Sequence, residues 1–558
     1  MKLRFEFHTA RPVPLYGRLC NQFLRHPEVQ AIGQDVDGYF IEAEGEQDTL
    51  SALADLIGRV FPLSCWLTDT RIEPIEQLRG DAVELKGVKP SLPYCQHCLD
   101  DPLSHCRHCG AQPVGDDATA ARLAQLFETF TEQGEVKYRA GDNTLTLVRL
   151  DHLGAADDAL LFCDPEALNH SLHINNIGIQ QLGSIEKPRL LMMPRADFRQ
   201  RYALPRARYR VQQSADRVTL ALANRLAQSG IPAVGIRQSH PPLCLTQFGD
   251  TPVPLTLSQA PSAIATHEPP RHRASLLGLT AHWDDGRVRF QASDILAEPD
   301  PDWAAACALE GVRQQDRTPK RSAVLYLSRR HRSGLLYKDN EGEYQWLVRL
   351  PDANEAPLSP SAMLEAIRSS ANGERLLTRY QEVDPEHLAA LAALPQTPLS
   401  GSFQSVLALA AWFSGQSSET DPAVAGEAFL CQALRFGGQA APRIDYGVKR
   451  EAGTLVVQWQ RALQACLSYR LADPDQKAGV AFGVIDSFCD FVCNWVEQLD
   501  MNIGLDELIL AGDEFDNPVL LERLRLRLGK NIALRLPTDF GPGPLVTGAL
   551  FVPQALAG

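Results

Sequence analysis

The sequence predicts a multidomain protein of mixed α+β and α/β class. Three observations support this prediction: a length of 558 residues, the composition, and the order of strand and helix patterns along the chain. At about 150 residues per domain, the length predicts roughly three to four domains. With 44% apolar and 22% charged residues, the composition is typical of globular domains that each bury a core.

Strand and helix patterns alternate in the first 75 residues. Apolar side chains recur at every second position in the strand patterns and at helical spacing in the helix patterns. The Asp-Gly pair at 37–38 is a hairpin signal. The expected elements are strand 3–7, helix 16–24, strands 31–33 and 39–41, helix 49–60 and strand 64–72. This β-α-β-β-α-β order predicts a ferredoxin-like split unit.

Two CxxC pairs follow within residues 93–110. The first is Cys95-Gln-His-Cys98, and the second, after seven residues, is Cys106-Arg-His-Cys109. Each pair can present two thiolates to one ion, and four thiolates fill the tetrahedral shell of a structural zinc site. A reduced, metal-free loop and a redox-active pair are the alternatives. Because so short a segment has no core of its own, we expect metal removal to unfold it.

The remainder of the chain predicts an α/β pattern. Between 117 and 265 we expect helices 119–131 and 215–228 and strands 144–149 and 190–193. Beyond 275 we expect strands 276–279, 322–327, 507–510 and 532–536, and helices 402–413, 423–436, 454–469, 477–499 and 518–528. Segments rich in turn residues at 73–93 and 258–274 predict linkers.

The net charge of −14 disfavours bulk nucleic-acid binding, which needs phosphate neutralisation. The first twelve residues lack the apolar core of a signal peptide, and no run approaches the ~20 apolar residues of a membrane span. The 13 cysteines are odd in number and mostly scattered, which indicates a reducing compartment. We therefore expect a cytoplasmic protein without membrane contact.

Residues 93–110 (PYCQHCLDDPLSHCRHCG) resemble the start of the zinc-finger region of the HypF family, the carbamoyltransferases of nickel-iron hydrogenase maturation. The spacer is shortened, and a second set of CxxC pairs expected in the family is absent. Residues 508–521 (LILAGDEFDNPVLL) resemble the family's strand-loop-helix near the nucleotide, and 537–541 (PTDFG) its closing motif. Residues 401–411 and 425–428 resemble two helical motifs between them.

This resemblance implies four parts in a fixed order. They are an acylphosphatase-like domain at 1–78, a zinc-finger segment at 79–114, a YrdC-like domain at 115–265 and a TsaD-like domain of actin/hexokinase-type fold at 273–558. It also implies carbamoyl transfer from carbamoyl phosphate, with ATP, to a cysteine of a HypE-like partner. ATP and a second metal are therefore the implied ligands besides zinc.

The implied catalytic residues are altered. An acylphosphatase cradles phosphate with a Gly-rich loop and an Arg. Here the loop at 10–16 reads ARPVPLY, and proline has no N–H to donate. The candidates that remain are Arg18, two places from the expected Arg, and Gln34, at the position of a water-orienting Asn.

The candidate nucleotide-binding residues are Lys187, Arg189, Gly512, Asn517 and Asp539, of which Asp539 matches the family's metal-binding Asp. The second glycine of the nucleotide loop is replaced by an aspartate, which repels phosphate. The family's His-rich metal motif is absent, because the histidines after residue 272 are isolated.

Two functions therefore remain open. The first is an enzyme that activates and transfers a carbamoyl group. The second is a non-catalytic zinc-binding scaffold or accessory protein of metalloenzyme maturation. The two prolines of the loop, Asp513 and the missing His motif favour the second.

Overall fold

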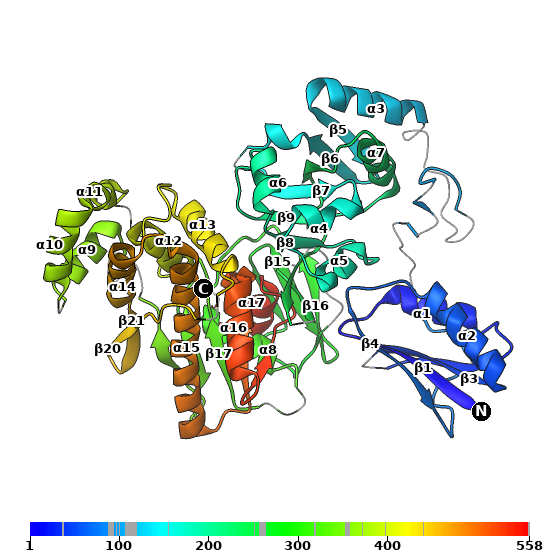
Figure 1. Ribbon diagram of the computed structural model, residues 1–558. Helices are drawn as coiled ribbons and strands as arrows, with labels where there is room; N and C mark the ends of the chain where they lie inside the picture. Colours follow the sequence, from blue (N-terminus) through cyan, green and yellow to red (C-terminus); the bar gives the residue numbers. More distant parts are fainter. Residues whose placement is uncertain are drawn as a thin grey trace. The chain divides into compact units, whose positions relative to one another are not determined.

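The computed structural model describes residues 1–35, 38–86, 94–95, 98–99, 101–106, 120–154, 156–249, 251–255, 264–316, 318, 320–351, 358–370, 372–396, 398–438 and 440–555. The chain forms two compact units (Figure 1). The first comprises residues 1–245 and 250–252, and the second comprises residues 246–249 and 253–558.

The first unit begins with a four-stranded sheet and two helices. The elements are β1 (Lys2–Thr9), α1 (Pro14–Phe23), β2 (Val29–Gln34), β3 (Gly38–Glu44), α2 (Gln47–Val60) and β4 (Leu67–Pro74). The sheet order is β2-β3-β1-β4, and every neighbouring pair is antiparallel. This is the split β-α-β-β-α-β arrangement expected from the sequence. The apolar faces of both helices join one core with Phe5 and Ile41 of the sheet.

The rest of the first unit is built on an eight-stranded mixed sheet of order β12-β11-β8-β9-β7-β10-β6-β5. Its strands are β5 (Glu135–Ala140), β6 (Asn143–Val148), β7 (Ala159–Phe162), β8 (Arg189–Met192), β9 (Tyr209–Gln212), β10 (Ala233–Gln238), β11 (Cys244–Phe248) and β12 (Thr251–Pro254). The α-helices are α3 (Ala120–Gln133), α4 (Leu168–Ser171), α5 (Asn176–Gly183), α6 (Ala196–Arg201) and α7 (Arg217–Gln228). Helices α3 and α7 pack their apolar faces against this sheet.

The second unit contains two sheets. A four-stranded antiparallel sheet has the order β13-β16-β15-β14, and a seven-stranded mixed sheet has the order β20-β21-β19-β18-β17-β22-β23. The strands are β13 (Ile264–Ala265), β14 (Arg273–Leu276), β15 (Leu279–Asp284), β16 (Arg287–Ala292), β17 (Ser322–Tyr326), β18 (Gly334–Lys338), β19 (Tyr344–Arg349), β20 (Gly447–Glu451), β21 (Thr454–Gln458), β22 (Glu507–Ala511) and β23 (Ala533–Arg535).

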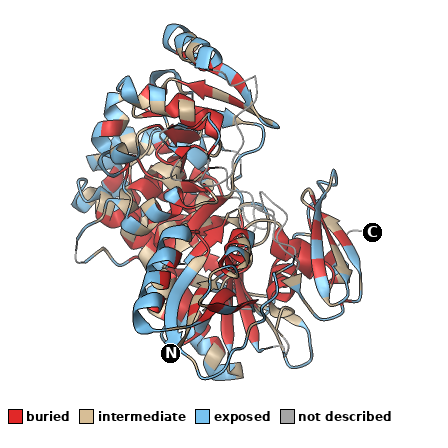
Figure 2. Ribbon diagram, turned by 90° about the vertical axis from the view of Figure 1, so that its right-hand side faces the viewer, coloured by how far each residue is buried: buried red, intermediate tan, exposed pale blue. Residues whose placement is uncertain are grey.

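The helices of the second unit lie between and after these strands in the sequence. They are α8 (Ala304–Arg313), α9 (Pro360–Arg368), α10 (Gly373–Val383), α11 (Pro385–Ala393), α12 (Phe403–Phe413), α13 (Pro422–Leu434), α14 (Trp459–Ala472), α15 (Lys477–Ile503), the short 3-10 helix η5 (Asp513–Asp516), α16 (Pro518–Leu528) and α17 (Gly543–Gly548). Figure 2 shows buried residues concentrated in the sheets and in the helix faces that cover them.

Helix α15 is long and apolar enough to cross a membrane by length and composition, which the sequence analysis did not anticipate. It has 27 residues, and its most apolar window has a mean hydropathy of 1.3. However, 67% of that window is buried inside the structure. Val484, Phe488 and Val496 lie in the main core of the second unit, so the apolar composition of α15 is explained by its place in this core.

Two element predictions were wrong. The expected strand at 276–279 contains the turn between β14 and β15, where Leu277 and Gly278 have φ of 54° and 78°. The expected helix at 454–469 begins only at Trp459, because residues 454–458 form β21 and pair with β20. The apolar run of β21 is as compatible with a strand as with a helix, and its pairing partner decides between them.

Helices α8 and α17 approach each other through glycines. A Cβ added at Gly311 would lie 2.0 Å from the carbonyl oxygen of Pro544, and one at Gly548 would lie 1.9 Å from that of Cys307. Only glycine allows this backbone contact. The two helices thereby join a core that includes residues of β14, β15 and β17.

Candidate functional site

Three of the four predicted metal ligands lie together. The Sγ atom of Cys95 is 3.8 Å from that of Cys98 and 3.6 Å from that of Cys106. Four sulfurs at about 2.3 Å from a zinc ion are separated by roughly 3.8 Å, so the three thiols fit one ion. Cys98 and Cys106 are buried and Cys95 is half-buried. The fourth predicted ligand, Cys109, lies outside the described residues.

The cysteine cluster is anchored to α7 and the segment before it. The hydroxyl of Tyr94 donates a hydrogen bond of 2.7 Å to the carbonyl of Ser214, and Asn224 donates one of 2.9 Å to the carbonyl of Leu99. Leu220 packs against Tyr94, Cys98 and Cys106. A metal bound here would therefore hold this segment on the first turns of α7.

Lys187 and Arg189 lie at the start of β8 and are both buried. The Lys187 Nζ donates to the carbonyl of Gly183 at 3.0 Å and lies 4.9 Å from the ring centre of Tyr94. The Arg189 Nε donates to the side chain of Gln212 at 2.6 Å. Burial lowers the pKa of Lys187 to about 8 and that of Arg189 to about 10. Both cations thus have protein partners in this structure.

The loop at 10–16 offers few donors for a phosphate. Pro14 is the first residue of α1, and Pro12, like Pro14, has no N–H. The N–H of Ala10 donates to Trp66 and that of Tyr16 to Val13. The guanidinium of Arg11 lies 4.5 Å from the ring centre of Trp66.

The two catalytic candidates of the first domain lie on separate elements. Arg18 is half-buried on α1, whereas Gln34 is exposed at the end of β2 and donates to the hydroxyl of Tyr39 at 3.4 Å. No hydrogen bond or ion pair joins these two described residues. Their predicted roles remain predictions.

Sequence reasoning missed Glu186, which joins the N-terminal sheet domain to the eight-stranded sheet. Its carboxylate accepts hydrogen bonds from the Ser64 hydroxyl at 2.5 Å and from the Cys65 N–H at 2.9 Å. Because Ser64 and Glu186 are 122 positions apart, no local pattern indicates this pairing.

Gly512 and Asn517 serve the turn between β22 and α16. Gly512 has φ +115° and ψ 160°, and an added Cβ would lie 2.0 Å from the carbonyl oxygen of Leu327. Asn517 caps α16 by accepting from the N–H groups of Val519 and Leu520, each at 3.1 Å. Both residues thus have a structural reason to occupy these positions.

Asp539 is fully buried, and its carboxylate accepts from protein donors. The Oδ1 atom accepts from the N–H of Gly541 at 2.9 Å and of Gly543 at 3.2 Å, and the Oδ2 atom from the Thr538 hydroxyl at 3.1 Å. These bonds orient the carboxylate towards the start of α17. Its predicted part in binding a nucleotide or metal remains a prediction.

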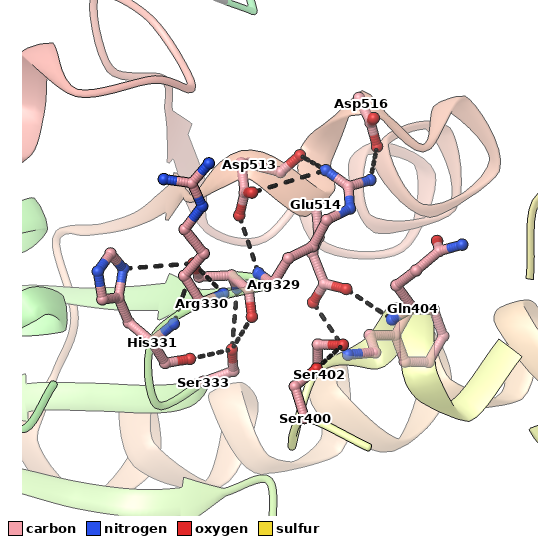
Figure 3. Close-up of polar contacts among 12 residues, drawn as sticks. Arg329, Arg330, His331, Ser333, Ser400, Ser402, Gln404, Asp513, Glu514 and Asp516 are labelled. Carbon is pink, nitrogen blue, oxygen red and sulfur yellow. Dashed lines mark hydrogen bonds and ion pairs between the residues drawn. The ribbon is translucent and has the colours of Figure 1, made fainter. Parts of the chain in front are cut away.

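Asp513, in place of the expected glycine, is paired with a cation (Figure 3). Its side chain accepts from the backbone N–H of Arg329 at 3.0 Å, and its backbone carbonyl accepts from the Arg329 guanidinium at 2.7 Å. The same guanidinium binds Asp516 at 2.7 Å. Arg329 comes from the loop between β17 and β18, so this loop and η5 are joined by their own charges.

The next residue, Glu514, occupies the N-terminus of α12 (Figure 3). It accepts from the backbone N–H groups of Phe403 at 3.0 Å and Gln404 at 2.5 Å. Burial raises the pKa of this carboxyl to about 7. A helix N-terminus attracts anions, and here the protein's own carboxylate already occupies it.

Together, the fold and these sites define a multidomain α/β protein with a cluster of three cysteines in its first unit that could hold a metal ion. No family model matches the sequence. The solved structures of full-length HypF in the phosphate- and nucleotide-bound form and of T. kodakarensis HypF match the chain with TM-scores of 0.60 at 11% identity. Each match covers 100% of this chain and 98% of the other. The chain therefore has the fold of full-length HypF.

A sequence relative gives a second comparison. Protein HydE of Wolinella succinogenes is 28% identical over 201 residues, which are 35% of this chain and 37% of HydE. The chain thus matches little more than a third of the length of this curated relative.

Proposed function

We propose that the chain is a HypF-like protein of nickel-iron hydrogenase maturation whose sites for carbamoyl transfer are altered. The observation that carries this proposal is the match along the whole of both chains to full-length HypF. The three clustered cysteines add support, since a zinc-finger segment is expected at this point of such a protein. The chain acts in the cytoplasm on a HypE-like partner.

Zinc fits the cysteine cluster, where it would be held by Cys95, Cys98 and Cys106, with Cys109 as the predicted fourth ligand. A shell of four thiolates leaves no open position, so the ion supplies structure and not a reactive water. ATP does not fit the residues at η5 in this conformation. Arg329 and Glu514 already bind protein groups there.

These observations favour the non-catalytic scaffold over the full enzyme. The loop at 10–16 has two prolines and two engaged N–H groups where a phosphate cradle needs donors. The loop at η5 has charge pairs where a nucleotide needs open donors. The protein would then use the zinc segment and its surfaces to hold a partner.

The test is release of AMP from ATP by the zinc-loaded full chain, with and without carbamoyl phosphate. We expect no release that depends on carbamoyl phosphate, while a full-length HypF assayed in parallel releases AMP. Zinc content and circular dichroism establish that the tested protein is folded. Release that requires carbamoyl phosphate would contradict the altered-site proposal and establish an active enzyme.

Partner binding is tested separately. The zinc-loaded chain should retain a HypE-like protein in a pull-down, and retention should fall when the cysteine cluster is disrupted by Cys98→Ser. The matched control is Cys431→Ser, because Cys431 lies on α13, away from the cluster in the sequence. Equal retention by the unaltered chain, Cys98→Ser and Cys431→Ser would exclude the zinc segment as the element that binds the partner. If none of the three proteins retains the HypE-like protein, this partner is excluded.

A further inference from the structure

The turn at 184–187, which follows α5 and leads into β8, is attached to the N-terminal sheet domain. The attachment consists of hydrogen bonds from the Ile185 N–H to the Leu63 carbonyl at 3.0 Å, from the Ser64 hydroxyl to the Glu186 carboxylate at 2.5 Å, and from the Cys65 N–H to the Glu186 carboxylate at 2.9 Å. Two successive residues of the turn thus hold the chain between α2 and β4.

The last residue of the same turn, Lys187, contacts the cysteine segment. Its Nζ lies 4.9 Å from the ring centre of Tyr94 and donates to the carbonyl of Gly183 at 3.0 Å. Lys187 is only 8% exposed, and a cation–π contact is strongest where water is excluded. The side chain is therefore held between the end of α5 and the aromatic ring that precedes the first predicted metal ligand.

Tyr94 is fixed in turn by the cysteine cluster. It directly precedes Cys95 in the chain, is 7% exposed, and packs with Cys98, Cys106 and Leu220 in one small core. A core of this size holds a segment weakly unless a metal joins its ligands. The position of the Tyr94 ring, and with it the cover on Lys187, therefore depends on the metal site.

The backbone of Lys187 has an unfavourable conformation. Its φ is +47°, which is uncommon for any residue except glycine. The next residue is Pro188, and a residue before proline favours an extended backbone with negative φ. Such a conformation persists only where surrounding contacts hold it. If the Tyr94 contact is lost, Lys187 can return to negative φ, which redirects the turn and weakens the hydrogen bonds of Ile185 and Glu186.

We propose that the turn at 184–187 is a junction through which metal occupancy of the cysteine cluster controls the attachment of the N-terminal sheet domain. With the metal bound, Tyr94 holds Lys187 at positive φ, and the turn keeps its hydrogen bonds to residues 63–65. Without the metal, this attachment is weaker. The inference rests on the zinc site of the proposed function and adds to it a second role for the metal, beyond holding its own segment.

The test is amide hydrogen exchange of the full chain at pH 7, with zinc bound and after its removal by a chelator. It is read on peptides that cover residues 62–67 and 183–189, which contain the donor N–H groups of Cys65 and Ile185. Protection of both peptides should fall about tenfold when zinc is removed, as expected for the loss of a buried cation–π contact. Tyr94→Leu leaves the cysteines in place and should show the same fall with zinc bound.

Lys187→Gly separates the junction from a general loss of structure. Glycine adopts positive φ without strain, so the turn no longer needs Tyr94 to keep its conformation. Protection of both peptides should then be independent of zinc, whereas peptides of α7, which packs on the cysteine segment through Leu220, should remain dependent on it. The matched control is Lys530→Gly, the same change at an exposed position of the second unit, which should behave as the unaltered chain.

The outcomes distinguish the junction from the zinc site. If the unaltered chain binds zinc but its two peptides exchange equally with and without the metal, the junction is overturned and the zinc site stands. Full zinc dependence of both peptides in Lys187→Gly would also overturn the junction. A chain that takes up no zinc would contradict the zinc site of the proposed function and the junction together. If Tyr94→Leu does not fold, zinc removal and Lys187→Gly still decide the question.

Discussion

Cys98→Ser should abolish tight zinc binding and release the segment that contains residues 94–106. The Cys98 thiol is fully buried and lies 3.8 Å from the Cys95 sulfur, within the distance set by a shared ion. A serine hydroxyl is not ionised near neutral pH and does not replace a thiolate. Structural zinc sites contribute on the order of 10–16 kcal/mol of apparent binding free energy, so losing one ligand has a large effect.

Zinc content after dialysis and the rate of limited proteolysis measure this effect. We expect about one zinc per chain in the unaltered protein, none in Cys98→Ser, and faster cleavage near the segment. Cys431→Ser should keep its zinc, because this residue lies on α13 in the other unit. One zinc per chain retained by Cys98→Ser would show that this thiol is not a ligand.

Gly512→Ala should destabilise the second unit by about 2–6 kcal/mol. The backbone of Gly512, with φ +115° and ψ 160°, lies in a region that other residues avoid, at a cost of about 1–3 kcal/mol. The added methyl group would also lie 2.0 Å from the carbonyl oxygen of Leu327, just after β17. Overpacking of this kind costs about another 1–3 kcal/mol, because β17 and β22 pair directly and one must move.

Denaturant unfolding measures the loss as a lower midpoint for the second unit. The matched control is Gly437→Ala in the same unit, where an added Cβ meets no atom within 4 Å and φ is not positive. It should change stability little. Equal midpoints for Gly512→Ala and Gly437→Ala would show that the turn after β22 can adjust to a side chain.

Local sequence patterns predicted the helices and strands whose signal lies within a short stretch of chain. The N-terminal sheet domain follows from periods of two and 3.6 and from the turn between β2 and β3. The cysteine cluster follows in part from the first CxxC spacing, because Cys95 and Cys98 lie in one tight turn, in which the N–H of Cys98 donates to the carbonyl of Cys95. Both signals are contained in short stretches of chain.

The charged contacts of the candidate site could not be predicted in this way. Arg329 and Asp516 are 187 positions apart, and Glu514 and Gln404 are 110 apart. Asp513 considered alone predicts repulsion of a phosphate. In the structure, however, its negative charge lies beside Arg329, whose backbone N–H donates to its carboxylate. Which charge neutralises which depends on how the strands pair, and the sequence pattern does not contain that information.

The glycine contact between α8 and α17 has a consequence for how the protein is made. Ribosomes add about 5–20 residues per second, so Pro544 follows Gly311, about 230 residues earlier, after roughly 10–50 s. During that time the nascent chain carries the Ala-rich α8 without the helix that completes its core. Folding of this core therefore waits until α17 has been translated, and a chaperone could bind the uncovered face of α8 during this interval.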